Sequence, residues 1–249
     1  MRFLDCNAWL GISPVRQVAP VLTTSEFVET MRREGVDGAL VWHVAQYYDG
    51  PTPGNEMLAE EIAPHPELTG SWAILPDADW EMPSPDELFR RMRNARIRAL
   101  RAFPARHGFF LDGLYCGKTL GAIVENRVPL FLSMRRGTDY ASVYSLLREF
   151  PRLRVVLCDH SEYSPDRHLL TLMRNFPNLY LDTTCFGLHG HIERFAREFG
   201  PERLLFGSGF PEIPFKTTIY EMERLDLPED ARAAIAGGNL ERLLSEVRL

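Results

Sequence analysis

The sequence predicts a single (β/α)₈ TIM barrel spanning residues 1–249, and three observations support this prediction. Eight short apolar runs of strand length alternate with segments of helical periodicity, which is the order expected of a parallel α/β protein. The chain has about the length that eight such units need. No Gly-x-Gly-x-x-Gly motif follows the first run, which disfavours an open dinucleotide-binding sheet.

The predicted strands are short apolar runs separated by glycine, proline and polar residues. In chain order they cover 2–6, 37–43, 70–75, 97–103, 129–133, 153–159, 178–184 and 203–208. No low-complexity tract or linker interrupts this alternation, so we expect one domain.

Local signals place the helices between these strands. Thr23 and Glu26 have the spacing of a capping box, and Gly35 suits the end of the helix that follows. Ser84 before Pro85 predicts a second helix start. Two further helices are expected around 216–225 and 228–247, after the last strand. We interpret 47–54 as a loop over the mouth of the barrel.

Composition limits the classes of partner and the compartment. A formal net charge of −6 disfavours nucleic-acid binding. No uncharged apolar run is long enough to span a membrane, and no signal peptide is apparent. The four cysteines lie far apart, as expected of reduced thiols in a cytoplasmic protein.

In a barrel of this kind, function lies where the strands end, at the carboxyl face. Many polar side chains lie at the predicted strand ends. Burying polar groups costs free energy, so we expect these residues to have a function. The candidate residues are Asp5, Asn7, Trp9, Trp42, His43, Arg101, His107, Ser133, Arg135, Asp159, His160, Asp182 and Ser208.

Side-chain chemistry suggests a role for several of these candidates. His43 or His160 can act as a general base near neutral pH, oriented by Asp159 or Asp182. Ser133 can bind substrate or act as a nucleophile, and Cys6 and Cys158 are other nucleophile candidates.

The remaining candidates are assigned to substrate binding. Arg101 and Arg135 can hold a substrate carboxylate. Trp9 and Trp42 can form an apolar wall, and Asp5, Asn7, His107, Asp182 and Ser208 complete the set that we expect to contact substrate.

Five stretches, in order along the chain, carry a resemblance to a known family. They are Asn55-Glu56 to Gly70, Arg98-Ala99-Leu100-Arg101 to Pro104, Phe176-Pro177-Asn178 to Thr184, Phe199-Gly200 to Pro211, and Gly238-Asn239 to Leu244. With them the chain resembles the amidohydrolase-related branch, amidohydrolase family 2, of the metal-dependent hydrolases. The resemblance implies hydrolysis of a C–N or C–O bond, or decarboxylation, of a small anionic organic molecule. Members are often dimers, so it also allows a homodimer.

The family's metal ligands are missing from the matching positions. The family has His-x-His at the end of strand one, where this chain has Asn7 and Trp9. Its histidines on strands five and six correspond to Ser133 and Asp159, and its strand-eight aspartate corresponds to Gly209. His160 lies one residue beyond the strand-six position and should face the opposite way. We therefore predict no metal ligand and no cofactor.

Three functional hypotheses follow from this combination. The first is a divergent hydrolase, or a decarboxylase-like lyase, that works without a bound metal. The second is a catalytically inactive barrel that binds a metabolite or a partner protein. The third is a hydrolase that holds Zn²⁺ or Mn²⁺ in a rearranged site built from Asp5, Asp159, His160 or Asp182.

Overall fold

Eight parallel strands form one sheet in which each strand pairs with the next along the chain. This computed structural model describes residues 1–15, 17, 20–77, 82–160, 166–186 and 190–249. The eight strands are counted among these residues. The strands are β1 Leu4–Leu10, β2 Gly38–His43, β3 Leu68–Ala73, β4 Ile97–Ala102, β5 Leu130–Ser133, β6 Val155–Cys158, β7 Leu179–Asp182 and β8 Leu204–Leu205. Each overlaps its predicted run, and the predicted (β/α)₈ fold is confirmed.

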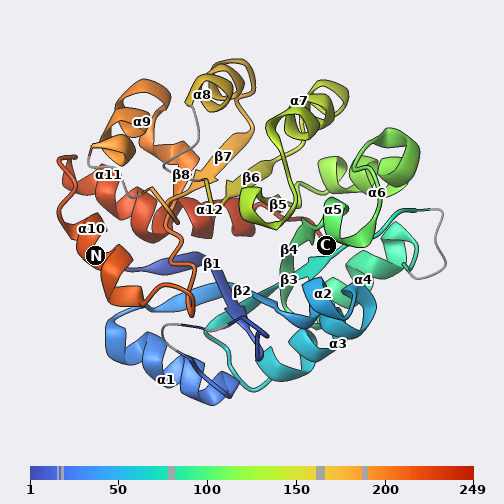
Figure 1. Cartoon of the computed structure of the whole chain (residues 1–249), viewed down its shortest axis with the longest axis horizontal. Coiled ribbons are helices and arrows are strands. Elements are labelled where there is room, and N and C mark those ends of the chain that lie inside the picture. Colours follow the sequence, from blue (N-terminus) through green and yellow to red (C-terminus); the bar gives the residue numbers. More distant parts are fainter. Residues whose placement is uncertain (16, 18–19, 78–81, 161–165, 187–189) are drawn as a thin grey trace.

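Helices follow the strands and surround them as a ring, with the sheet at the centre (Figure 1). They are α1 Thr24–Glu34, α2 Ala45–Tyr48, α3 Pro51–Ile62, α4 Pro85–Asn94, α5 Pro104–His107, α6 Gly113–Glu125, α7 Tyr140–Glu149, α8 Asp166–Asn175, α9 His191–Phe199, α10 Phe215–Glu223, α11 Glu229–Ala233 and α12 Asn239–Ser245. Three short turns are η1 Met134–Arg136, η2 Pro201–Arg203 and η3 Ala234–Gly238. None of the helices in the described residues is both long and apolar enough to cross a membrane.

The first and last strands close the barrel through backbone hydrogen bonds beyond the end of β8. The N–H of Cys6 donates to the carbonyl of Phe206 at 2.8 Å, and that of Trp9 donates to Phe210 at 3.0 Å. In the other direction, the N–H of Gly209 donates to the carbonyl of Asn7 at 3.0 Å. The chain after β8 therefore lies against β1, which brings residues 207–213 to the carboxyl face.

Inward and outward side chains alternate along the strands, as a pleated strand requires. An apolar layer fills the lower barrel, and Leu240 and Leu243 of α12 pack against it. Figure 1 shows α12 crossing behind the strands, so this helix closes the amino-terminal end of the barrel. The opposite, carboxyl end carries a second cluster that includes Trp9, Trp42 and Phe103.

Segment 47–54 is not the loop that we expected. Residues Ala45–Tyr48 form α2, and α3 begins at Pro51 after Gly50, which has a φ of 121°. Proline suits the first turn of a helix because its missing N–H has no helical partner there. Gly54 permits the two helices to touch, since a Cβ at this position would lie 2.3 Å from the backbone nitrogen of Gln46.

Candidate functional site

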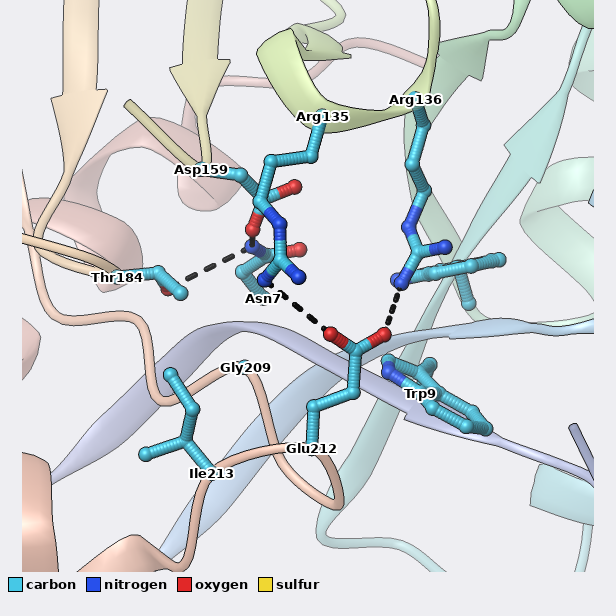
Figure 2. Close-up of a pocket in the computed structure, with 10 residues that line it drawn as sticks. Asn7, Trp9, Arg135, Arg136, Asp159, Thr184, Gly209, Glu212 and Ile213 are labelled. Carbon is cyan, nitrogen blue, oxygen red and sulfur yellow. Dashed lines mark hydrogen bonds and ion pairs between the residues drawn. The ribbon is translucent and has the colours of Figure 1, made fainter. Parts of the chain in front are cut away.

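A narrow pocket, whose open mouth and interior together enclose about 250 Å³ of empty space, opens at the carboxyl face of the barrel. Its lining comes from five strand ends and from the segment after β8 (Figure 2). The lining residues are Asn7, Trp9, Trp42, Arg135, Arg136, Asp159, Thr184, Gly209, Glu212 and Ile213. Five of them were among the sequence candidates, so the structure brings Asn7, Trp9, Trp42, Arg135 and Asp159 together.

Below the pocket, Asn7 lies between two aspartates. Its Nδ2 amide donates to Asp159 Oδ1 at 2.9 Å and to Asp182 Oδ2 at 2.8 Å. The backbone N–H of Asp159 donates to Asp182 Oδ1 at 3.1 Å, and the hydroxyl of Ser133 donates to Asp159 Oδ2. Both oxygens of Asp159 therefore accept a hydrogen bond, and its carboxylate is held in one orientation.

Strand periodicity explains why these side chains meet. Ser133 lies two residues after Phe131 in β5, and Asp182 lies two residues after Tyr180 in β7. Residues two apart in a strand share a face, so both polar side chains point inward like the two aromatic ones. Asp159 follows β6 with a φ of 57°, in the left-handed region that aspartate adopts more readily than most residues. Unusual backbone geometry of this kind is common at functional sites.

The pKa of Asp182 is raised well above its ordinary value. Burial of the carboxyl group is the main cause, and the neighbouring charge of Asp159 adds to it. The hydrogen bond from Asn7 acts in the opposite direction but does not cancel these effects. Asp182 therefore tends to keep its proton beside Asp159, which is the usual outcome when two carboxyl groups share a buried site.

Two arginines and a glutamate form the rim of the pocket (Figure 2). Glu212 contacts Arg136 through Oε1 and Arg135 through Oε2, the latter at 3.2 Å. Arg136 and Glu212, together with Thr184, Gly209 and Ile213, were not among the sequence candidates. Arg136 could have been predicted, because it follows the candidate Arg135 in the sequence. Glu212 could not, because its place at the pocket depends on how the chain folds after β8.

His43 does not line the pocket. In β2 it follows Trp42, and because Trp42 faces the interior, His43 faces the outer helices. Its Nδ1 accepts from the N–H of Ala45 at 3.1 Å, and its Nε2 lies 3.3 Å from Glu61 Oε1. Burial acts to raise the pKa of Glu61, but hydrogen bonds from His43 and Thr24 hold it below its ordinary value.

His160 also points away from the cluster of Asp159, as the sequence predicted for the residue after the aligned position. Its Nδ1 forms a hydrogen bond of 2.8 Å with the hydroxyl of Tyr140, and its ring lies against Phe186. His107 lies in a different hollow, beside Pro51 and Pro53 at the start of α3. The structure thus places none of the three candidate histidines at the pocket.

Asp5 and Ser208 pair with each other outside the pocket. The N–H of Ser208 donates to Asp5 Oδ1 at 3.0 Å, and its hydroxyl donates to Asp5 Oδ2. An extra residue in β1, between the pairs Asp5–Ala39 and Ala8–Val41, changes the phase of the strand. Asp5 consequently does not share a face with Asn7 and Trp9, and it does not line the pocket as we expected.

Arg101 is buried inside the barrel and does not line the pocket. Its guanidinium carbon lies 5.1 Å from the ring centroid of Phe131 and 5.6 Å from that of Trp42. One terminal nitrogen donates to the carbonyl of Cys6 at 3.4 Å, and Nε has no hydrogen-bond partner among the described residues. This arginine lowers the electrostatic cost of burying Asp5, since its charge acts against the raised pKa of that carboxyl group.

Cys6 and Cys158 are free thiols in the barrel interior. Burial raises the pKa of both thiols well above their ordinary values. A thiol must ionise to be a good nucleophile. The environment of these two cysteines therefore opposes the nucleophilic role considered for them.

The side chains around Asn7 do not fit the divalent ion that the family resemblance implies. An ion would need oxygen, nitrogen or sulfur lone pairs directed at one point. Here the amide of Asn7 directs N–H groups toward both aspartates, and the hydroxyl of Ser133 donates to Asp159. Among the described residues, no three His, Cys, Asp or Glu side chains are grouped to hold a metal ion.

Solved structures with the same fold include enzymes and a protein without an assigned activity. An uncharacterized TIM-barrel protein from Bordetella bronchiseptica is 18% identical, with a TM-score of 0.72 and 99% of each chain covered. The 5-carboxyvanillate decarboxylase LigW from Sphingomonas paucimobilis is 15% identical, with a TM-score of 0.74 over 98% of this chain and 99% of that one. A probable 2-pyrone-4,6-dicarboxylic acid hydrolase from Acinetobacter baumannii, with citric acid bound, is 14% identical, with a TM-score of 0.73 over 98% and 100%.

At these identities the structural likeness establishes the fold. No curated protein matches the chain. The family model for Amidohydrolase, Amidohydro_2, matches residues 36–245, which is most of the chain and includes all the strands after β1. The chain therefore belongs to the Amidohydrolase family, with Asn7, Ser133 and Asp159 where the resemblance leads us to expect metal-binding histidines.

Proposed function

We propose that this protein is a hydrolase that cleaves a C–O or C–N bond in a small anionic molecule without a bound metal ion. The observation that carries the proposal is the carboxylate of Asp159, which lines the pocket and is held by Asn7 and Ser133. The pocket is narrow, and Trp9 and Trp42 give it an apolar side. The fold shared with a probable pyrone dicarboxylic acid hydrolase also supports a lactone as substrate.

In the proposed reaction Asp159 acts as the general base. It removes a proton from water while the water oxygen forms a bond to the substrate carbonyl carbon. The C–O or C–N bond of the resulting tetrahedral intermediate then breaks, and the proton passes from Asp159 to the leaving oxygen or nitrogen. Hydrogen bonds from Asn7 and Ser133 leave further lone pairs of the Asp159 carboxylate available.

Asp182 is proposed as a positioning residue. It is fully buried, accepts from the backbone N–H of Asp159, and shares the amide of Asn7 with it. Because Asp182 tends to stay protonated, the negative charge of the pair is concentrated on Asp159, at the pocket. A metal-free base of this kind replaces the activation of water that an ion would supply.

The proposal is tested by hydrolysis assays on a panel of carboxylate-bearing lactones, esters and amides. We expect Asp159→Asn to lower kcat/KM by at least about 100-fold, because the amide cannot accept the proton. Asp49→Asn is the matched control, since Asp49 is exposed and lies outside the pocket. Activity that survives Asp159→Asn would refute the assignment of the base.

Decarboxylation is the second candidate, favoured by the fold shared with a 5-carboxyvanillate decarboxylase. In that reaction the bond between the substrate carbon and its carboxylate breaks to release CO₂, and Asp159 would have to carry a proton and deliver it to that carbon. Release of CO₂ from aromatic acids, lost in Asp159→Asn, would support this candidate instead. If neither assay detects turnover while small acids still bind, the hypothesis of an inactive binding barrel gains support.

We also propose a cytoplasmic location and a homodimer. Cytoplasmic location agrees with four free cysteines and can be tested by cell fractionation. A homodimer can be tested by light scattering on the purified protein.

A further inference from the structure

The rim of the pocket holds two guanidinium groups close together. Arg135 and Arg136 are consecutive residues of η1, directly after β5, and both line the pocket. Arg136 is held over aromatic rings, with its guanidinium carbon 5.0 Å from the ring centroid of Trp42 and 5.7 Å from that of Tyr47. Planar guanidinium groups stacked in this way are well suited to bind a carboxylate.

A carboxylate of the protein itself occupies the space between them. Glu212 directs one oxygen to each arginine, so that it bridges the pair (Figure 2). It lies on a tight turn in which its N–H donates to the carbonyl of Gly209 at 3.0 Å. The rim itself carries two cations and one anion, and the carboxylate of Asp159 lines the same pocket and interacts with Arg135.

The bridge is only partly shielded from water. The side chain of Glu212 is 29% exposed, that of Arg135 is 52% exposed and that of Arg136 is 19% exposed. Water and salt screen the pair with Arg135 most strongly, so this pair contributes little net stability. Another anion can therefore compete with Glu212 for the two arginines, while Arg136 keeps its place on the aromatic rings.

We infer that Glu212 occupies the site of the substrate carboxylate and is displaced when an anionic ligand binds between Arg135 and Arg136. This inference rests on the proposed function, whose anionic substrate it assigns to a definite pair of residues. Glu212 is then an internal competitor that lowers the affinity for every carboxylate ligand and favours those able to displace it.

The test measures binding rather than turnover. Benzoate and acetate are titrated calorimetrically into the wild-type protein and into Glu212→Gln. Glutamine keeps the size of the side chain but removes the competing charge, so we expect both acids to bind about five- to tenfold more tightly, the equivalent of about 1–1.4 kcal/mol. Arg136→Gln should weaken binding of both by a similar factor.

Two controls make the outcome specific. Glu223→Gln removes the same charge from an exposed position of α10 and should leave the affinity for benzoate unchanged. Benzamide, which has the shape of benzoate but no charge, should bind wild type and Glu212→Gln equally. Circular dichroism and thermal melts verify that each variant is folded.

Three results would overturn the inference. Neither acid binds Glu212→Gln more tightly than wild type; or Glu223→Gln strengthens binding as much as Glu212→Gln does; or benzamide gains as much as benzoate. Because benzoate and acetate need not react, the result does not depend on turnover. Tighter binding to Glu212→Gln in a protein without activity would refute the proposed reaction and leave this inference standing.

Discussion

Asn7 places a neutral amide between two buried carboxyl groups. The absence of a charge on this side chain is therefore as important as its shape. Replacing it by aspartate would put a third carboxyl group against Asp159 and Asp182. We expect Asn7→Asp to lower the free energy of unfolding by about 3 kcal/mol at pH 7, since an additional buried like charge lacks a counterion. The deficit should shrink at pH 5, where the new group can hold a proton. Urea denaturation at the two pH values measures it.

Asn7→Ala separates the effect of charge from the loss of hydrogen bonds. It removes the same two donations without adding a carboxyl group, so its deficit should depend less on pH than that of Asn7→Asp. Wild-type stability in Asn7→Asp at pH 7 would contradict the prediction and would indicate that a cation compensates the three carboxyl groups.

The raised pKa of Asp182 makes the free energy of unfolding depend on pH. The folded protein keeps this proton in a range where the unfolded chain, with a carboxyl pKa of about 3.9, has lost it. The contribution of Asp182 to stability is thus complete below that value and is lost as the pH rises through the folded pKa. Asp182→Asn should reduce the fall in unfolding free energy across this range, by up to about 1.4 kcal/mol per pH unit.

Denaturant titrations from pH 4 to pH 8 compare the slopes. The absolute stability of Asp182→Asn will also change, because asparagine cannot accept both hydrogen bonds that Asp182 accepts. The slope is therefore the informative quantity. Asp49→Asn, at an exposed position, serves as the control and should keep the wild-type slope; an unchanged slope in Asp182→Asn would show that the group is ionised in the folded protein.

Local signals in the sequence were sufficient for the start of α1. The hydroxyl of Thr23 accepts from the N–H of Glu26 at 3.2 Å, and the Glu26 carboxylate accepts from the N–H of Thr23 at 3.3 Å. We expect Thr23→Ala to lower the unfolding free energy by about 1 kcal/mol through loss of this cap. Ser25→Ala removes a hydroxyl outside the capping box and should cost less. Thermal melts compare the two, and equal losses would argue against the cap.

The predicted strand ends likewise provided part of the site, because Trp9, Ser133 and Asp159 were chosen there. Strand alternation turned His160 away from Asp159. The choice of Asp5 was wrong, because an extra residue in β1, set by pairing with β2 and with the chain after β8, keeps its side chain out of the pocket. Glu212 could not be found from a local pattern, because its position depends on how that distant segment folds over the pocket.

At the scale of the whole barrel, the carboxyl end holds the buried carboxyl groups of Asp5, Asp159 and Asp182, and the buried guanidinium of Arg101 acts on Asp5. In the proposed function, hydrogen bonds from Asn7, Ser133 and Ser208 and retained protons compensate these carboxyl groups in place of a metal ion. A ligand that binds only the folded state raises the melting temperature according to its affinity. Protein purified without chelator or affinity metal should therefore contain well under about a tenth of an equivalent of zinc or manganese, with no increase in melting temperature when either ion is added.

Elemental analysis and thermal melts with each ion measure this directly, with Asn7→Asp as a positive comparison because its three carboxyl groups offer only oxygen ligands. About one equivalent of metal in the wild-type protein, together with a higher melting temperature, would contradict the metal-free proposal. The amide of Asn7 would then have to turn its oxygen toward the ion, since its N–H groups cannot ligate one. Loss of that metal in Asn7→Ala would identify the ligand, and hydrolysis would return to the ion-assisted chemistry that the family resemblance implies.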